Sequence, residues 1–268
     1  MYEPETLKPP SLLLTLSEAP RALAERASLC GQLYWLRRMP QGDGHPVMII
    51  PGFVGDDSGN QPLIDYLEAL GYKATGWNLG RNLGHGLLDP EILIDRVNSL
   101  FNATGQPVSL VGHSLGGVYA REIAKLWSHE VRQVITLGSP FGEGRSAASH
   151  ATKLYRAISP HRGDDDDAEW AAAPPVPTTS VYSRYDGIIN WKVSLQADGH
   201  AETENIEIYG SHTGMTVNPV VWYLLADRLA QPLGNWRPFE RKGFGHFIYP
   251  TPVWQATDSL EMTGQAVG

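Results

Sequence analysis

Ser114 has the residue type and the local pattern of an activated nucleophile. It is the middle residue of GHSLG at 112–116, where the apolar run VSLV (108–111) stops and a helical pattern begins. A sharp turn from strand to helix holds a serine in a strained backbone conformation and lifts its hydroxyl above the edge of the sheet. Small residues two positions before and after it are needed, because larger side chains would clash within the turn. The pattern predicts nucleophilic catalysis by Ser114.

A serine hydroxyl is a weak nucleophile, so this chemistry needs a base and an acid that orients the base. Asp186 stands at the end of the β-type run SVYSRYDG (180–187), and His212 comes two residues after the run NIEIYG (205–210). Sites in open α/β sheets form at the carboxyl ends of parallel strands, which is where both residues are expected. We therefore predict that His212 removes the serine proton while Asp186 fixes the tautomer of the imidazole and stabilises its charged form.

The elements that must position these residues alternate between strands and helices. Strand patterns lie at 47–50, 72–79, 108–112, 131–139, 178–187 and 205–210. Helical patterns lie at 60–71, 90–105, 115–128 and 218–230. Such alternation predicts an α/β fold with a mostly parallel sheet that is covered by helices on both faces.

The alternation of strands and helices is interrupted at the two ends of the chain and once in its middle. We divide the chain into a helical N-terminal segment, an α/β domain and a tail packed on that domain, at 1–44, 45–230 and 231–268. Within the domain, residues 140–177 form a long insertion, which is more often functional than idle. We expect it to cover the site as a cap or lid, with Tyr155 and Trp170 as apolar lining. A plain solvated loop is the alternative.

The stretch GHSLGG (112–117), placed between strand and helix, resembles the nucleophile turn of the α/β-hydrolase superfamily, and within it that of lipases and esterases. The stretches ITLGSPF (135–141) and YSRYDGIINW (182–191) are similar to compact members of that superfamily. The resemblance covers residues 45–230 and implies the α/β-hydrolase fold with about six strands. In this chain the first antiparallel strand pair of larger members is replaced by the helical segment 1–44.

The resemblance also implies an oxyanion hole, formed by two backbone N–H groups that stabilise the charge on the substrate oxygen. The N–H of Leu115, at the start of the helix after the serine, is expected to be one donor. The N–H of Phe53 is expected to be the second, because Pro51-Gly52-Phe53 follows the buried run VMII (47–50). Val54 is the alternative donor if the register shifts by one residue.

The order of residues in the superfamily separates these candidates from their competitors. The acid and then the base follow the serine, as Asp186 and His212 do here. His85 lies in a glycine-rich loop after a predicted strand, but it precedes the serine. Asp198 and the acidic run at 164–167 do not end a strand, and the run is expected to be a solvated loop rather than a calcium site.

These residues predict a serine hydrolase that cleaves carboxylic esters, a carboxylesterase or lipase, through an acyl-enzyme on an apolar substrate. An acyltransferase or thioesterase that uses the same triad on an acyl-CoA or activated ester is the alternative. It would need a phosphate-binding patch, which Arg81, Arg145 and Arg184 supply only if the fold gathers them. A non-catalytic binding protein would be expected to carry a broken triad. No metal or organic cofactor is implied, because zinc-ligand spacings are absent.

Composition bears on which partners the protein binds and in which compartment it is found. The formal net charge of −8 argues against electrostatic binding of nucleic acid. The single cysteine, Cys30, excludes an internal disulfide and is expected in the core. No secretory signal and no membrane-spanning run are recognised, so a cytoplasmic location is expected. Peripheral membrane contact through residues 11–38 is possible, but a helix packed on the domain is favoured.

Overall fold

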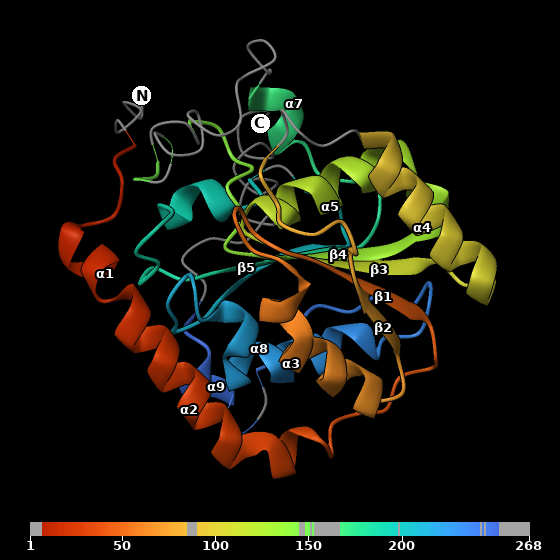
Figure 1. The fold of residues 1–268 in the computed structure, drawn as a ribbon, viewed down its shortest axis with the longest axis horizontal. Coiled ribbons are helices and arrows are strands. Elements are labelled where there is room, and N and C mark those ends of the chain that lie inside the picture. The colour runs from red at the N-terminus through yellow and green to blue at the C-terminus, as the bar shows by residue number, and fades with distance from the viewer. Residues whose placement is uncertain are drawn as a thin grey trace, which may run out of the picture.

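Six parallel strands form a single sheet in the order β2-β1-β3-β4-β5-β6 (Figure 1). The structure, a computed structural model, describes residues 7–84, 90–144, 148–150, 152, 167–197, 199–241, 243 and 245–251. The strands are β1 (Pro46–Ile50), β2 (Lys73–Gly76), β3 (Val108–His113), β4 (Val131–Leu137), β5 (Thr178–Tyr182) and β6 (Thr203–Glu207). The predicted α/β class with a parallel sheet is confirmed.

Helices cover both faces of the sheet, and each face has its own apolar core (Figure 1). One layer contains α2 (Glu18–Leu36), α3 (Asp57–Ala69) and α8 (Pro219–Leu229), and the other contains α4 (Pro90–Thr104) and α5 (Leu115–Leu126). The short helices are α1 (Leu12–Leu16), α7 (Asp167–Ala171) and α9 (Gly245–Ile248), with 3-10 turns at Ser128–Glu130, Trp191–Ser194 and Met215–Val217.

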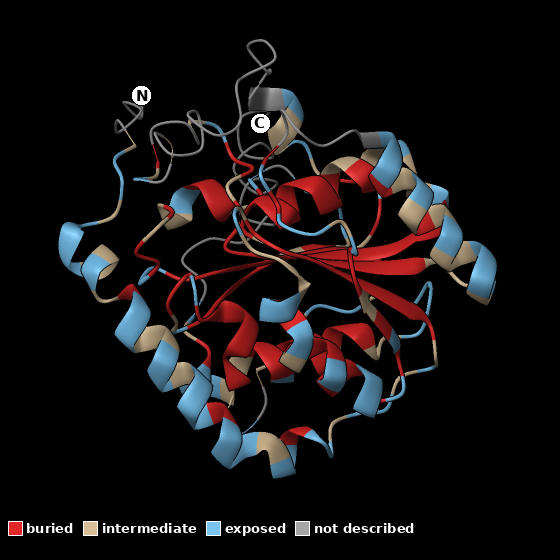
Figure 2. Cartoon of the chain, viewed as in Figure 1, coloured by how far each residue is buried: buried red, intermediate tan, exposed pale blue. Residues whose placement is uncertain are grey.

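The central strands are buried on both faces, as Figure 2 shows. In β1, Ile49 packs into the core beneath α3 and α8, whereas Met48 and Ile50 pack into the core beneath α4 and α5. Because both faces exclude water, the strand reads as a continuous apolar run rather than an alternating one. This explains why short apolar runs located these strands in the sequence.

Several predicted boundaries differ from those in the structure. The strand expected at 178–187 ends at Tyr182, because the chain turns there and Asp186 accepts hydrogen bonds from Ile188 and Ile189. The helix expected at 60–71 begins earlier, at Asp57, because the side chain of Asp56 caps it by accepting from the N–H of Ser58 at 3.0 Å. In both places a side chain decides where the element begins or ends.

The apolar contact of the N-terminal helices with the domain is made by α2. Leu29 and Leu36 of α2 are buried in the core that α8 also lines. Cys30 faces solvent, so its expected core position was wrong. Four leucines of α1 and α2 are exposed on the outer side: Leu12, Leu13, Leu16 and Leu23. In the described part of the chain, no helix has the length and apolarity required to cross a membrane. Peripheral membrane contact through residues 11–38 stays the less favoured alternative.

The described part of the C-terminal tail packs on the domain. Tyr249 is buried, and its hydroxyl donates to the carbonyl of Val220 in α8 at 2.8 Å. Of the expected cap lining, Trp170 is half-buried against the core beneath α4 and α5, whereas Tyr155 lies outside the described residues. The cap role of residues 140–177 stays a prediction.

Gly116 of α5 is expected to be essential for stability. A Cβ atom there would lie 2.3 Å from the carbonyl oxygen of Ile50 and 2.6 Å from that of Pro51. Because the clash is with backbone, Gly116→Ala should lower the free energy of unfolding by at least about 2 kcal/mol. Gly59 of α3 is the matched control, since a Cβ there meets nothing within 4 Å. Gly59→Ala should raise it by roughly 0.5–1 kcal/mol, and urea unfolding of both variants measures the contrast.

Candidate active site

Ser114 sits in the tight turn between β3 and α5. Its backbone has φ 52° and ψ −123°, a region that side chains other than glycine seldom occupy. The turn is held because the N–H of Ser114 donates to the carbonyl of Leu137 in β4 at 2.8 Å. A Cβ on Gly112 would lie 2.3 Å from the Cα of Gly117, so no larger residue fits there. The local geometry is that of a strained serine turn.

Asp186 and His212 form a buried hydrogen-bonded pair beyond the carboxyl ends of β5 and β6. The Nδ1 atom of His212 lies 2.6 Å from Oδ2 of Asp186. The other oxygen of Asp186 accepts from the N–H groups of Ile188 and Ile189 at 2.8 and 2.7 Å. Since an ionised carboxylate only accepts, the proton must sit on Nδ1 of His212. This leaves Nε2 of His212 unprotonated and able to act as a base in the neutral ring.

The charges around His212 favour its protonated form. Burial alone would lower the pKa of this imidazole, but the negative charge and hydrogen bond of Asp186 outweigh burial, and the charge of Glu18 adds to them. The net effect raises the pKa of His212 above its ordinary value. A proton taken up at Nε2 is therefore held more firmly than in a free histidine.

The serine turn and the His212–Asp186 pair are adjacent. His113, the residue before Ser114, donates from Nε2 to the carbonyl oxygen of His212 at 2.9 Å, and the two rings lie 4.9 Å apart between centroids. Gly138 follows Leu137, which accepts from the N–H of Ser114, and a Cβ on Gly138 would be 3.1 Å from Nδ1 of His212. Within the described residues, no hydrogen bond joins the Ser114 hydroxyl to His212. Such bonds are often long without substrate and shorten when it binds.

Of the expected oxyanion donors, Leu115 is the first residue of α5, where an N–H has no acceptor within the helix. Phe53 follows β1 and packs half-buried against the core beneath α5. The alternative, Val54, donates its N–H to the carbonyl of Asn82 at 2.7 Å. That bond engages the N–H of Val54, and the role of Phe53 as the second donor stays a prediction.

Asn82 is a residue near the site that sequence reasoning missed. It is buried, its side chain donates to the carbonyl of Pro51 at 2.8 Å, and its N–H donates to the carbonyl of Gly55 at 2.8 Å. Together with the bond from Val54, these contacts fix the loop that contains Phe53. The only signal in the sequence was the glycine-rich stretch GRNLG after a strand.

Most of the competing candidates cannot be placed relative to this site. His85, Asp198, Arg145 and residues 164–166 lie outside the described residues. Arg184 pairs with Glu207 at 2.8 Å, and Arg81 lies 3.8 Å from Asp56. Among the residues described, no group of three His, Cys, Asp or Glu side chains is arranged to hold a metal ion.

A second Ser–His–Asp arrangement lies at the opposite end of the strands, where β1 and β3 begin. His45 contacts Asp43 through Nδ1 at 2.5 Å and Ser109 through Nε2 at 2.8 Å. Ser109 is fully buried in β3, near its amino end, and Asp43 also pairs with Arg132 at 2.7 Å. A substrate cannot reach a fully buried hydroxyl, so this cluster ties strands together. Residue types alone would not have separated the two arrangements.

Comparison with known proteins bears on the fold. Residues 84–215 match the family described as the PGAP1-like alpha/beta domain. Among solved structures, lipase B of Aspergillus fumigatus has a TM-score of 0.53 at 19% identity, covering 72% of this chain and 54% of the lipase. Lipase BlEst2 of Bacillus licheniformis has a TM-score of 0.51 at 16% identity, covering 72% of this chain and 95% of the lipase. No curated protein sequence is similar enough to count as a relative. The expected α/β-hydrolase fold is confirmed.

Proposed function

We propose that this chain, whose fold is that of the α/β-hydrolase superfamily, is a serine hydrolase that cleaves carboxylic esters. His212 takes the proton of the Ser114 hydroxyl as its oxygen attacks the acyl carbon of the ester. The N–H groups of Leu115 and Phe53 stabilise the oxyanion, and the protonated His212 then delivers its proton to the departing alcohol. Water, activated by the same histidine, releases the acid from the acyl-enzyme.

The observation that carries this proposal is the adjacency of two features that have no structural need of each other. One is a serine held at φ 52° between a strand and a helix, and the other is the buried His212–Asp186 pair at 2.6 Å. A non-catalytic protein with this fold would have no reason to keep the acid, the base and the nucleophile together. The strained serine turn would also be a cost without a use.

The substrate we propose is an ester with an apolar acyl chain, as expected for a carboxylesterase or lipase. The alternative, a thioesterase or acyltransferase acting on acyl-CoA, would need cations free to bind phosphates. Arg184 forms an ion pair with Glu207 at 2.8 Å, and Arg81 lies near the carboxylate of Asp56. Because both cations already face carboxylates, these contacts do not support acyl-CoA as the substrate.

Hydrolysis of p-nitrophenyl esters from acetate to palmitate tests the proposal, beside labelling by a fluorophosphonate probe. We expect turnover of at least part of the series and covalent labelling of Ser114, identified by peptide mass. The chain length with the highest kcat/KM would then report the size of the acyl site. If no ester is turned over and the probe leaves Ser114 unlabelled, the hydrolase function is wrong and a ligand-binding role would replace it.

A further inference from the structure

Glu18, the first residue of α2, is buried against the loops that carry the proposed acid and base. The residue is 5% exposed, although glutamate is rarely buried without partners. We propose that Glu18 is a positioning residue that fixes the Asp186 and His212 loops to each other and places a second negative charge beside the His212 ring. This inference rests on the proposed function, which supplies the roles of Asp186 and His212.

Five hydrogen bonds end on the two oxygens of the Glu18 carboxylate. Oε1 accepts from the N–H of Gly187 at 2.8 Å and from the N–H of His212 at 3.0 Å. Oε2 accepts from the N–H and the hydroxyl of Thr213, both at 2.9 Å. The fifth donor is Arg21, at 2.8 Å from Oε1. Because Gly187 directly follows Asp186, one carboxylate joins the loop after β5 to the loop after β6.

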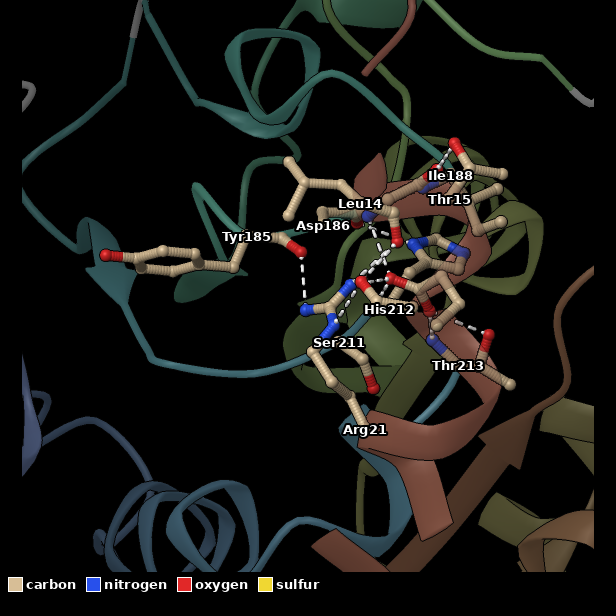
Figure 3. A network of polar contacts seen from close by, with 12 residues as sticks. Leu14, Thr15, Arg21, Tyr185, Asp186, Ile188, Ser211, His212 and Thr213 are labelled. Atoms are coloured by element: carbon tan, nitrogen blue, oxygen red, sulfur yellow. Dashed lines mark hydrogen bonds and ion pairs between the residues drawn. The ribbon is translucent and has the colours of Figure 1, made fainter. Parts of the chain in front are cut away.

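Neighbouring residues of the same segment hold the acid loop from its other side. The hydroxyl of Thr15 donates to the carbonyl of Gly187 at 2.7 Å, and Arg21 donates to the carbonyl of Tyr185 at 2.7 Å. Figure 3 shows Thr15, Arg21 and Tyr185 gathered around Asp186 and His212. These bonds satisfy backbone groups on both sides of Asp186, so the loop has little freedom to move the carboxylate.

The carboxylate of Glu18 is ionised at neutral pH. Burial alone would raise the pKa of Glu18, but the N–H groups of Thr213, His212 and Gly187 hold it below its ordinary value. The start of a helix also favours negative charge. An ionised Glu18 stabilises the protonated form of His212 and is one of the causes of its raised pKa.

Among the described residues, the other titratable groups that face His212 are Asp186 and His113. Burial lowers the pKa of His113 to about 3, so it stays neutral over the working range. Glu25, on the same helix as Glu18, reaches the N–H of Ser211 at 2.7 Å and contacts no atom of the His212 ring. Glu18 is thus the carboxylate, beyond the acid itself, whose charge acts on the base.

The test is an NMR titration of the His212 ring in the wild-type protein and in Glu18→Gln, beside the pH profile of kcat/KM. The neutral glutamine removes the charge and cannot accept all five bonds. We expect the pKa of His212, and with it the acid limb of the profile, to move down by about 0.5–1 pH unit. We also expect kcat to fall about tenfold through looser positioning, with a smaller change in KM.

Two further variants keep the test decisive. Glu25→Gln removes a half-buried carboxylate from the same helix and should leave the acid limb in place. Arg21→Met removes the cation beside Glu18 and should move the limb upward, by less, because Arg21 is partly exposed. If Glu18→Gln does not fold, the shift of the acid limb in Arg21→Met still tests whether the charges at this place act on the pKa of His212. The proposal is overturned if kcat falls in Glu18→Gln while the pKa of His212 stays unchanged, since that would indicate a purely structural role. The NMR titration decides this even if no ester is hydrolysed, so the two proposals can fail separately.

Discussion

Ser114→Ala should lower ester hydrolysis at least about 10³-fold without unfolding the protein. The substitution removes the attacking oxygen, and what activity remains comes from binding and from the oxyanion donors. The serine hydroxyl makes no hydrogen bond among the residues described, so its loss leaves no partner unsatisfied. The measurement is kcat on the best p-nitrophenyl ester, with thermal unfolding of both proteins as the check on the fold.

Ser109→Ala is the matched control, because Ser109 also lies beside a histidine that contacts an aspartate. Its hydroxyl is 2.8 Å from Nε2 of His45 and is fully buried. The variant should lose about 1–2 kcal/mol of stability, since a buried partner is left unsatisfied, yet keep its kcat per folded molecule. If Ser114→Ala keeps wild-type kcat, or if Ser109→Ala loses it while folded, the assignment of the nucleophile is wrong.

The serine turn and the positions of Asp186 and His212 after two strands could be predicted because their signals are local. An apolar strand, a glycine, a serine and a helical pattern are all contained within residues 108–126, and Asp186 and His212 each come at the end of a short β-type run. Parallel topology then places the ends of such strands at one edge of the sheet. The sequence also indicated that helices replace the first strand pair.

The residues that hold the site in place could not be predicted, because their partners are distant in the sequence. Glu18 is 169 residues from Gly187 and 195 from Thr213. In the sequence it is one acidic residue near the start of a helix, which is most often explained by the helix dipole. Asn82 resembles an ordinary loop residue for the same reason. Glu18 is buried because α2 packs against the domain, and this packing is not visible in the sequence near residue 18.

The order of residues along the chain was also needed to choose among histidines. His45 has an aspartate and a serine as partners at hydrogen-bond distance, as a catalytic histidine would. It lies at the amino end of β1, at the edge where open α/β sheets do not form their sites. Topology, rather than the types of residue, therefore separates the buried cluster from the proposed active site.

Asp186→Asn should lower kcat about 10⁴-fold at neutral pH, with little change in KM. The amide oxygen can still accept from Ile188 and Ile189, as Oδ1 of Asp186 does at 2.8 and 2.7 Å. The amide NH2 then faces Nδ1 of His212, which must become an acceptor and carry its proton on Nε2 instead. A histidine in that tautomer cannot take the proton of Ser114. Glu18 cannot compensate, because it contacts the backbone N–H of His212 and not the ring.

Steady-state kinetics of Asp186→Asn against Asp95→Asn measures this effect. Asp95 is exposed on α4, so its variant undergoes the same chemical change away from the site and should keep wild-type kcat. Loss of the carboxylate should also lower the pKa of His212, because the charge of Asp186 is the main cause that raises it. The NMR titration of the ring would then move down more than in Glu18→Gln. A loss of less than about tenfold, well below what a missing triad acid costs, would show that another carboxylate, with Asp198 the first candidate, orients the base.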